Sequence, residues 1–189
     1  MDKIGIQAHL FVGYKAQTPE AYDRSARELV DRGDPIKMLD ALDVLGSFGL
    51  PLEITEITIP TFGEGEEFEQ LQADMLKLWY SAYFSHPLMD TVVYWNTADG
   101  HGFSRGVEYD ENRCRGGLFH KDMTPKKSAL MLKHLFEEEW NTSLELKADE
   151  NGYIDFRGFY GGYTVSGAQG CATLALSKNK SIPNTLTLQ

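Results

Sequence analysis

The chain lacks long apolar runs and has only two cysteines. No stretch of about 18 apolar residues occurs in its 189 residues, so no membrane-spanning helix is predicted. The first residues, MDKIGIQAHL, lack a charged segment followed by an apolar one, so no signal peptide is predicted. Cys114 and Cys171 show no Cys-x-x-Cys spacing, which argues against a zinc site and favours two free thiols. No metal and no other cofactor is expected.

Basic residues are also scarce. The 18 lysines and arginines are outnumbered by 28 aspartates and glutamates, and they form no cluster. Phosphate contacts need clustered basic side chains, so neither nucleic acid nor an anionic membrane is expected as a partner. Aromatic residues make up 12% of the chain, which suits a neutral polysaccharide better, because such polymers are often held on aromatic faces.

Strands and helices alternate along the first part of the chain. Residues 3–10 alternate apolar and polar, which predicts a strand with Gln7 and His9 on its polar face. Caps and periodicity predict the remaining elements, which are helices over 18–33, 34–49, 66–87 and 124–140 and strands over 50–59 and 90–96. In the third of these helices, the apolar positions at helical spacing are Leu71, Met75, Leu78 and Trp79. This order predicts parallel strands and an α/β architecture.

Unusual polar and aromatic residues stand where these strands end. They are His9, Glu56, Trp95 and Asn96, and the carboxyl ends of parallel strands are where α/β proteins build their sites. Glu53 and Glu56 are three residues apart on one strand. Because side chains alternate along a strand, the two carboxylates are expected on opposite faces and cannot form an acid/base pair.

The pattern changes after residue 140. We expect a first domain over 1–140 and a small antiparallel β appendage over 141–189, with turns at 150–152 and 161–162. The appendage is rich in aromatics that alternate with glycines, which are either the core of a hairpin or a platform for sugars: Tyr153, Phe156, Phe159, Tyr160 and Tyr163.

Four segments in order carry a family resemblance. The segment GLPLEITEI resembles the nucleophile signature of glycoside hydrolase family ten, the endo-1,4-β-xylanases. IGIQAH, VVYWNTADG and GGLFHKDMTPKKSALML resemble other strands and the final loop and helix of that family, and together these matches cover residues 3–138. The tail resembles a β extension of some members. The resemblance implies strands six to eight of a (β/α)8 TIM barrel, α/β in class, followed by a small antiparallel β appendage.

The resemblance also implies roles. Glu56 would be the nucleophile of a retaining hydrolysis of β-1,4-xylosidic bonds, His9 would orient it, and Gln7 would assist. Trp95 would form the aromatic floor of the sugar subsite next to the cleaved bond. The resemblance also places Asn96, Asp99 and Phe103 at the substrate. The alternatives that stay open are an ion-paired surface Glu56, a packed His9, a structural Gln7, a core Trp95, a loop-capping Asp99 and a loop-packing Phe103.

Two substitutions and one omission set the chain apart. Thr58 stands where the family usually has an acidic residue or Asn that holds the histidine, and Asn96 replaces a usual Gly. The family's general acid/base is a Glu in an Asn-Glu pair on the fourth strand, and this sequence contains no Asn-Glu. The chain is therefore expected to be an endo-xylanase that is inactive without an N-terminal half or self-association.

Two other functions stay open. One is a non-catalytic module that binds xylan or another hemicellulose, and the other is a structural fragment without activity. The expected substrate is xylan or xylo-oligosaccharides, and the expected location, by resemblance, is extracellular or periplasmic, as for a secreted hydrolase.

Overall fold

The computed structural model describes residues 2–10, 27, 32–61, 63–106, 109–168 and 170–177. The chain divides into two compact units, Met1–Lys133 and His134–Gln189. The helix predicted over 18–33 lies almost entirely outside the described residues. In the part of the chain that is described, no helix is both long enough and apolar enough to cross a membrane.

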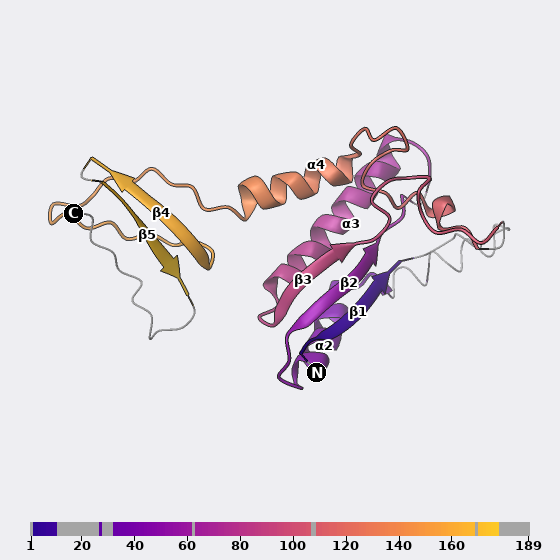
Figure 1. Ribbon diagram of the computed structural model, residues 1–189, viewed down its shortest axis with the longest axis horizontal. Coiled ribbons are helices and arrows are strands. Elements are labelled where there is room, and N and C mark those ends of the chain that lie inside the picture. The colour runs from indigo at the N-terminus through magenta and orange to yellow at the C-terminus, as the bar shows by residue number, and fades with distance from the viewer. Residues whose placement is uncertain are drawn as a thin grey trace. The chain divides into compact units, whose positions relative to one another are not determined.

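The first unit is built on a three-stranded parallel sheet, as the α/β prediction required. Strands β1 (Ile4–His9), β2 (Leu52–Thr58) and β3 (Met89–Tyr94) lie in the order β1-β2-β3 (Figure 1). Helices α2 (Pro35–Gly46) and α3 (Glu66–Ser85) connect them and pack against each other and the sheet. The strands therefore end at a common edge, where loops can bring side chains together.

Helix α2 begins where the sequence predicted and ends at Gly46, three residues before the predicted end at Gly49. The side chain of Asp34 accepts a hydrogen bond from the Ile36 backbone N–H at 2.9 Å, which caps the first turn. Pro35 follows at the first helical position, where its missing N–H costs no hydrogen bond. Gly49 closes the segment with a φ of 73°, a left-handed conformation that glycine adopts without strain.

The core lies between the sheet and the helices. The central strand segment supplies four side chains that are at most 1% exposed: Leu52, Ile54, Ile57 and Ile59. Burying one side chain of this size stabilises the folded state by about 1.5–3 kcal/mol. Helix α3 covers them with a face that includes the following residues: Gln72, Ala73, Leu76, Trp79, Tyr80 and Tyr83. The predicted apolar face of this helix was therefore partly wrong, since Leu71 and Leu78 are 43% and 47% exposed.

A β-bulge interrupts the central strand. Ile6 pairs with Ile54, but the next residue, Gln7, pairs with Glu56, so Thr55 is the extra residue on β2. Ile54 and Ile57 are both buried although they are three positions apart, so the bulge reverses the alternation. Glu53 and Glu56 consequently lie on the same face of the sheet, opposite the helices. The prediction that they lie on opposite faces is wrong.

A long loop joins β3 to helix α4 (Lys127–His134) and contains the 3₁₀ helix η1 (Glu111–Cys114). Isolated β-bridges tie Ala98 to Phe119 and Phe119 to Pro125. These bridges hold the loop against itself beside the carboxyl end of β3.

The second unit contains the π-helix η2 (Leu135–Glu139) and the antiparallel hairpin of β4 (Gly161–Gly167) and β5 (Gly170–Leu176). The predicted turn around Gly152 is present, with the Gly152 N–H bonded to the Asp149 carbonyl at 3.1 Å. The turn predicted at 161–162 is wrong, because Gly161 and Gly162 are paired residues of β4.

Candidate active site

The carboxylate of Glu56 is held by two side chains of the neighbouring strand. Its Oε1 accepts a hydrogen bond from Gln7 Nε2 at 3.0 Å, and its Oε2 lies 2.9 Å from His9 Nε2. Gln7 and His9 are alternate residues of β1 and share a face, while the bulge turns Glu56 to that same face. The structure thus brings Gln7, His9 and Glu56 together, and each carboxylate oxygen of Glu56 is engaged separately.

Thr58 fixes the other side of the His9 ring. Its hydroxyl donates to the Trp95 carbonyl at 3.3 Å, and its Oγ1 lies 3.2 Å from His9 Nδ1. With the hydroxyl proton directed to Trp95, Oγ1 is left to accept from Nδ1–H. His9 Nε2 then faces the Glu56 carboxylate, and a hydrogen bond there requires one proton between the two groups. Thr58 therefore orients the His9 ring so that Nε2 faces the Glu56 carboxylate.

Gly116 allows the loop to approach Thr58 closely. A Cβ atom at this position would lie 2.4 Å from Thr58 Cγ2, far inside ordinary contact. Thr58 is fully buried beneath this glycine. The conformation of Thr58, and through it that of His9, therefore depends on a residue without a side chain 58 positions along the chain.

Trp95 follows the last residue of β3 and remains 38% exposed. Its ring meets that of His9 edge-on, with centroids 6.2 Å apart and an interplanar angle of 70°. Its indole N–H donates to Glu111 Oε2 at 3.0 Å. An aromatic face thus stands beside the group that holds Glu56.

Glu111 is a residue of this site that the sequence did not single out. Its side chain is 6% exposed, and the same Oε2 also accepts from Asn96 Nδ2 at 2.9 Å. Asn96 has a φ of 62°, and its amide is directed to this carboxylate. The available signal was weak: Asp110 precedes a Glu-Asn pair and caps the 3₁₀ helix η1 through Asn112.

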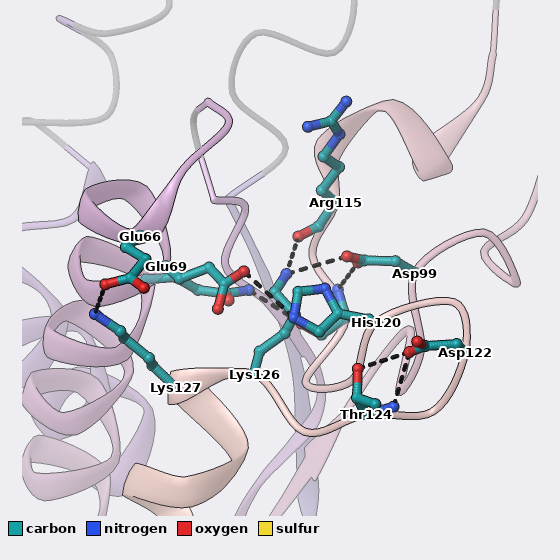
Figure 2. A network of polar contacts seen from close by, with 11 residues as sticks. Glu66, Glu69, Asp99, Arg115, His120, Asp122, Thr124, Lys126 and Lys127 are labelled. Atoms are coloured by element: carbon teal, nitrogen blue, oxygen red, sulfur yellow. Dashed lines mark hydrogen bonds and ion pairs between the residues drawn. The ribbon is translucent and has the colours of Figure 1, made fainter.

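Asp99 is engaged in a separate network of polar contacts (Figure 2). Its Oδ1 accepts from the Gly117 N–H at 2.8 Å, and its Oδ2 is 3.2 Å from the Nζ of Lys126. Lys126 is 1% exposed and also donates to the Arg115 carbonyl at 2.8 Å. Burial lowers the pKa of Lys126, and the neighbouring Asp99 carboxylate opposes that effect. These contacts match the loop-capping alternative, and a role of Asp99 in substrate binding stays a prediction.

Phe103 lies in the same loop and is 45% exposed. Its ring is 5.9 Å from that of Tyr109 and 5.5 Å from the Arg105 guanidinium carbon. Its carbonyl accepts the backbone N–H of Glu111 at 3.0 Å, so Phe103 supports η1 whatever its side chain contacts.

The aromatic residues of the second unit differ among themselves. Phe156 and Tyr163 are half-buried and pack edge-on at 5.5 Å, while Tyr153 and Tyr160 are 69% and 67% exposed. A cleft of about 310 Å³ opens beside the start of β4, and no residue along it carries a formal charge at neutral pH: Trp140, Asn141, Thr142, Phe159, Tyr160, Gly161, Gly162, Tyr163 and Thr164.

Comparison with known proteins supports the resemblance. No family model matches the chain. Endo-1,4-beta-xylanase 2 of Arabidopsis thaliana is 24% identical over 173 residues, which are 83% of this chain and 15% of that protein. Anti-sigma-I factor RsgI6 of Acetivibrio thermocellus is 32% identical over 137 residues, which are 72% of this chain and 16% of that protein. The chain therefore spans only about a sixth of the length of these relatives.

Among solved structures, the β-glucuronidase of Ruminococcus gnavus is similar with a TM-score of 0.51 and 20% identity, covering 72% of this chain and 22% of that one. At this identity the likeness concerns the fold, and the α/β unit fits part of a TIM-barrel glycosidase. Over most of its length the chain is a homologue of the endo-1,4-β-xylanases, the glycoside hydrolases of family ten that its strand-end motifs resemble.

Proposed function

We propose that this chain supplies the nucleophile side of an endo-1,4-β-xylanase site, with Glu56 as the nucleophile. In a retaining mechanism the carboxylate attacks the anomeric carbon, the glycosidic bond breaks, and the covalent xylosyl-enzyme ester is later hydrolysed by water. The single observation that carries the proposal is the geometry of Glu56, whose two oxygens are held by Gln7 at 3.0 Å and by His9 at 2.9 Å. A carboxylate fixed in this way is oriented before substrate arrives.

The neighbouring residues take supporting roles in this proposal. His9, fixed by Thr58 on its other nitrogen, orients Glu56 and stabilises its charge. Trp95 offers its exposed indole face to the apolar face of a xylosyl ring. We also propose that Asn96, Asp99 and Phe103 shape the same end of the site, acting through the loop that follows β3.

The proton for the leaving oxygen must come from another segment. In the retaining geometry the second carboxyl lies about 5–5.5 Å from the first. Glu53 shares the face of Glu56 but stands opposite Gly5, toward the amino end of β2, so it is at the wrong end of the strand. We therefore propose that barrel strands on another polypeptide, on a longer form of this chain or on a second copy contribute the general acid/base.

A non-catalytic module for xylan or another hemicellulose is the second candidate. The observations that favour it are the 38% exposure of Trp95 and the uncharged cleft of the second unit. An extracellular or periplasmic location belongs to either proposal, because xylan is a wall polysaccharide outside the cytoplasm.

The test compares two carboxylates of the same strand. Glu56→Gln and Glu53→Gln each remove one charge from the same face of β2. The chain is combined with a polypeptide that carries the first five barrel strands, and reducing-sugar release from xylan is measured. We expect Glu56→Gln to abolish turnover and Glu53→Gln to leave it within about twofold. Equal activity of both variants would refute the nucleophile assignment, and binding without turnover in the wild type would favour the module.

A further inference from the structure

Glu111 is a buried carboxylate that has two neutral hydrogen-bond donors on one oxygen. Oε2 accepts from the Trp95 indole N–H at 3.0 Å and from the Asn96 amide at 2.9 Å, while the residue is only 6% exposed. A carboxylate gives up much of its hydration to occupy such a place, so the hydrogen bonds that it makes there are strong and directional. Both donors belong to the residues that immediately follow β3.

From these contacts we infer that Glu111 is a positioning residue that fixes the ring plane of Trp95 beside the nucleophile. This inference rests on the proposed function only in naming a xylosyl ring as what the Trp95 indole contacts. Glu111 does not itself reach substrate, because its side chain is almost wholly buried. It acts through Trp95, whose indole has a single N–H to donate, and that one bond sets the rotation of the ring about its side-chain torsions.

The ring is linked to the nucleophile by a short series of contacts. Trp95 meets the His9 ring edge-on at 6.2 Å, and His9 Nε2 lies 2.9 Å from Glu56. A rotation of the indole would therefore change both the proposed sugar platform and the packing that supports His9. Without Glu111 the ring must be ordered by each ligand that binds.

Asn96 is the second residue whose side chain is held by Glu111. Its φ of 62° is a left-handed conformation that costs a non-glycine residue energy, and its side-chain amide is turned to Glu111. The indole and the amide both donate to the same carboxylate oxygen, and a neutral glutamine carbonyl in that place would accept the two hydrogen bonds more weakly than the charged oxygen does. Glu111 thus holds both the turn that follows β3 and the ring that precedes it.

The first experiment is spectroscopic and needs no ligand. In ¹⁵N–¹H spectra of the full chain, Trp95→Phe identifies the Trp95 indole resonance. Glu111→Gln should move that proton upfield and speed its hydrogen exchange about 10-fold, because the charge-assisted bond is lost. The ring-current shift of the His9 carbon-bound protons should change as well. Glu66→Gln, which removes one charge from a side chain that is 91% exposed, should change none of these signals.

The second experiment adds xylotriose to the same chains. Glu111→Gln should weaken binding about 2- to 10-fold, the usual cost of immobilising one more side chain, and should have no such effect in the Trp95→Phe background. Unchanged indole and His9 signals in Glu111→Gln would overturn the positioning role, and so would altered signals with unchanged affinity. A wild-type chain that binds no xylotriose would instead count against the proposed substrate, while the spectra alone would decide the role of Glu111.

Discussion

Replacing Gly116 by alanine tests how the loop supports the site. The added Cβ would lie 2.4 Å from Thr58 Cγ2, so one of the two must move. Thr58 is fully buried and β-branched, and its hydroxyl is tied to His9 and to the Trp95 carbonyl. Overpacking of this kind costs about 1–3 kcal/mol, against a gain of about 0.4–1 kcal/mol from the stiffer unfolded chain. We expect the free energy of unfolding to fall by about 1–2 kcal/mol.

A second substitution removes the clash itself. Thr58→Ser deletes the methyl group that meets the new Cβ but keeps the hydroxyl that bonds His9. Alone it should cost about 1 kcal/mol for the lost methyl. Combined with Gly116→Ala, it should cost clearly less than the sum of the two, with a coupling energy of about 1 kcal/mol or more.

The assay is urea unfolding of the chain, followed at backbone amide resonances of β2 so that only the first unit is observed. The His9 ring signals serve as a second reporter, since Gly116→Ala should shift them and the double variant should restore them. Strictly additive free energies would refute the reasoning. So would a Gly116→Ala chain whose stability and His9 signals match the wild type.

Three further outcomes are expected. Lys126→Met should lower the free energy of unfolding by about 3 kcal/mol, because it leaves the half-buried Asp99 carboxylate without its ammonium partner. The control is Lys127→Met: the pair of Lys127 with Glu66 is exposed, so this change should alter the free energy of unfolding by less than about 0.5 kcal/mol in the same urea titration. Burial raises the pKa of Tyr80 to about 12, so this phenol ionises in the unfolded chain before it ionises in the folded one, and the free energy of unfolding should fall as pH rises from about 10 to 12. Tyr80→Phe should reduce that fall by up to about 2–3 kcal/mol. An unchanged slope of the free energy of unfolding against pH would contradict the burial argument. The 189-residue chain by itself should release no reducing sugar from xylan above background, and robust release would mean that a second carboxylate acts from this chain or from a second copy.

Local signals predicted the elements of the first unit. The Asp34–Pro35 start of α2 and the alternation in β1 depend on residues close together in sequence, and the structure has both elements there. The order of strand and helix in turn required parallel pairing, which places His9, Glu56 and Trp95 at one edge of the sheet. That part of the site therefore followed from sequence order and from the family resemblance.

The bulge did not follow, because it depends on two strands at once. A Cβ at Gly5 would lie 2.8 Å from the Thr55 methyl group, so the missing side chain on β1 makes room for the extra residue on β2. The Thr55 hydroxyl also bonds the Ile6 carbonyl at 3.1 Å. Alternation within β2 alone predicts that Glu53 and Glu56 lie on opposite faces of the sheet. The pairing of β2 with β1 is what shows that they share a face.

Tertiary hydrogen bonds account for two other differences. Gln72 is fully buried in α3 because its amide bonds the Ile59 carbonyl at 2.7 Å, and this moves the buried face away from Leu71. Glu111 lies in a loop without periodicity, and its burial is set by the indole and amide of residues 15 or 16 positions earlier. Neither effect is encoded in a local pattern.

The central claim is that Glu56 attacks the sugar, and covalent trapping tests it most directly. A dinitrophenyl fluoroxylobioside carries a leaving group that departs without a proton, so the nucleophile acts alone, and its fluorine slows hydrolysis of the ester that forms. In the chain combined with a polypeptide of the first five barrel strands, mass spectrometry should find one fluoroxylobiosyl group, located on Glu56. Glu53→Gln should label like the wild type, and Glu56→Gln should remain unlabelled. A label on another residue, or undiminished labelling of Glu56→Gln, would contradict the account.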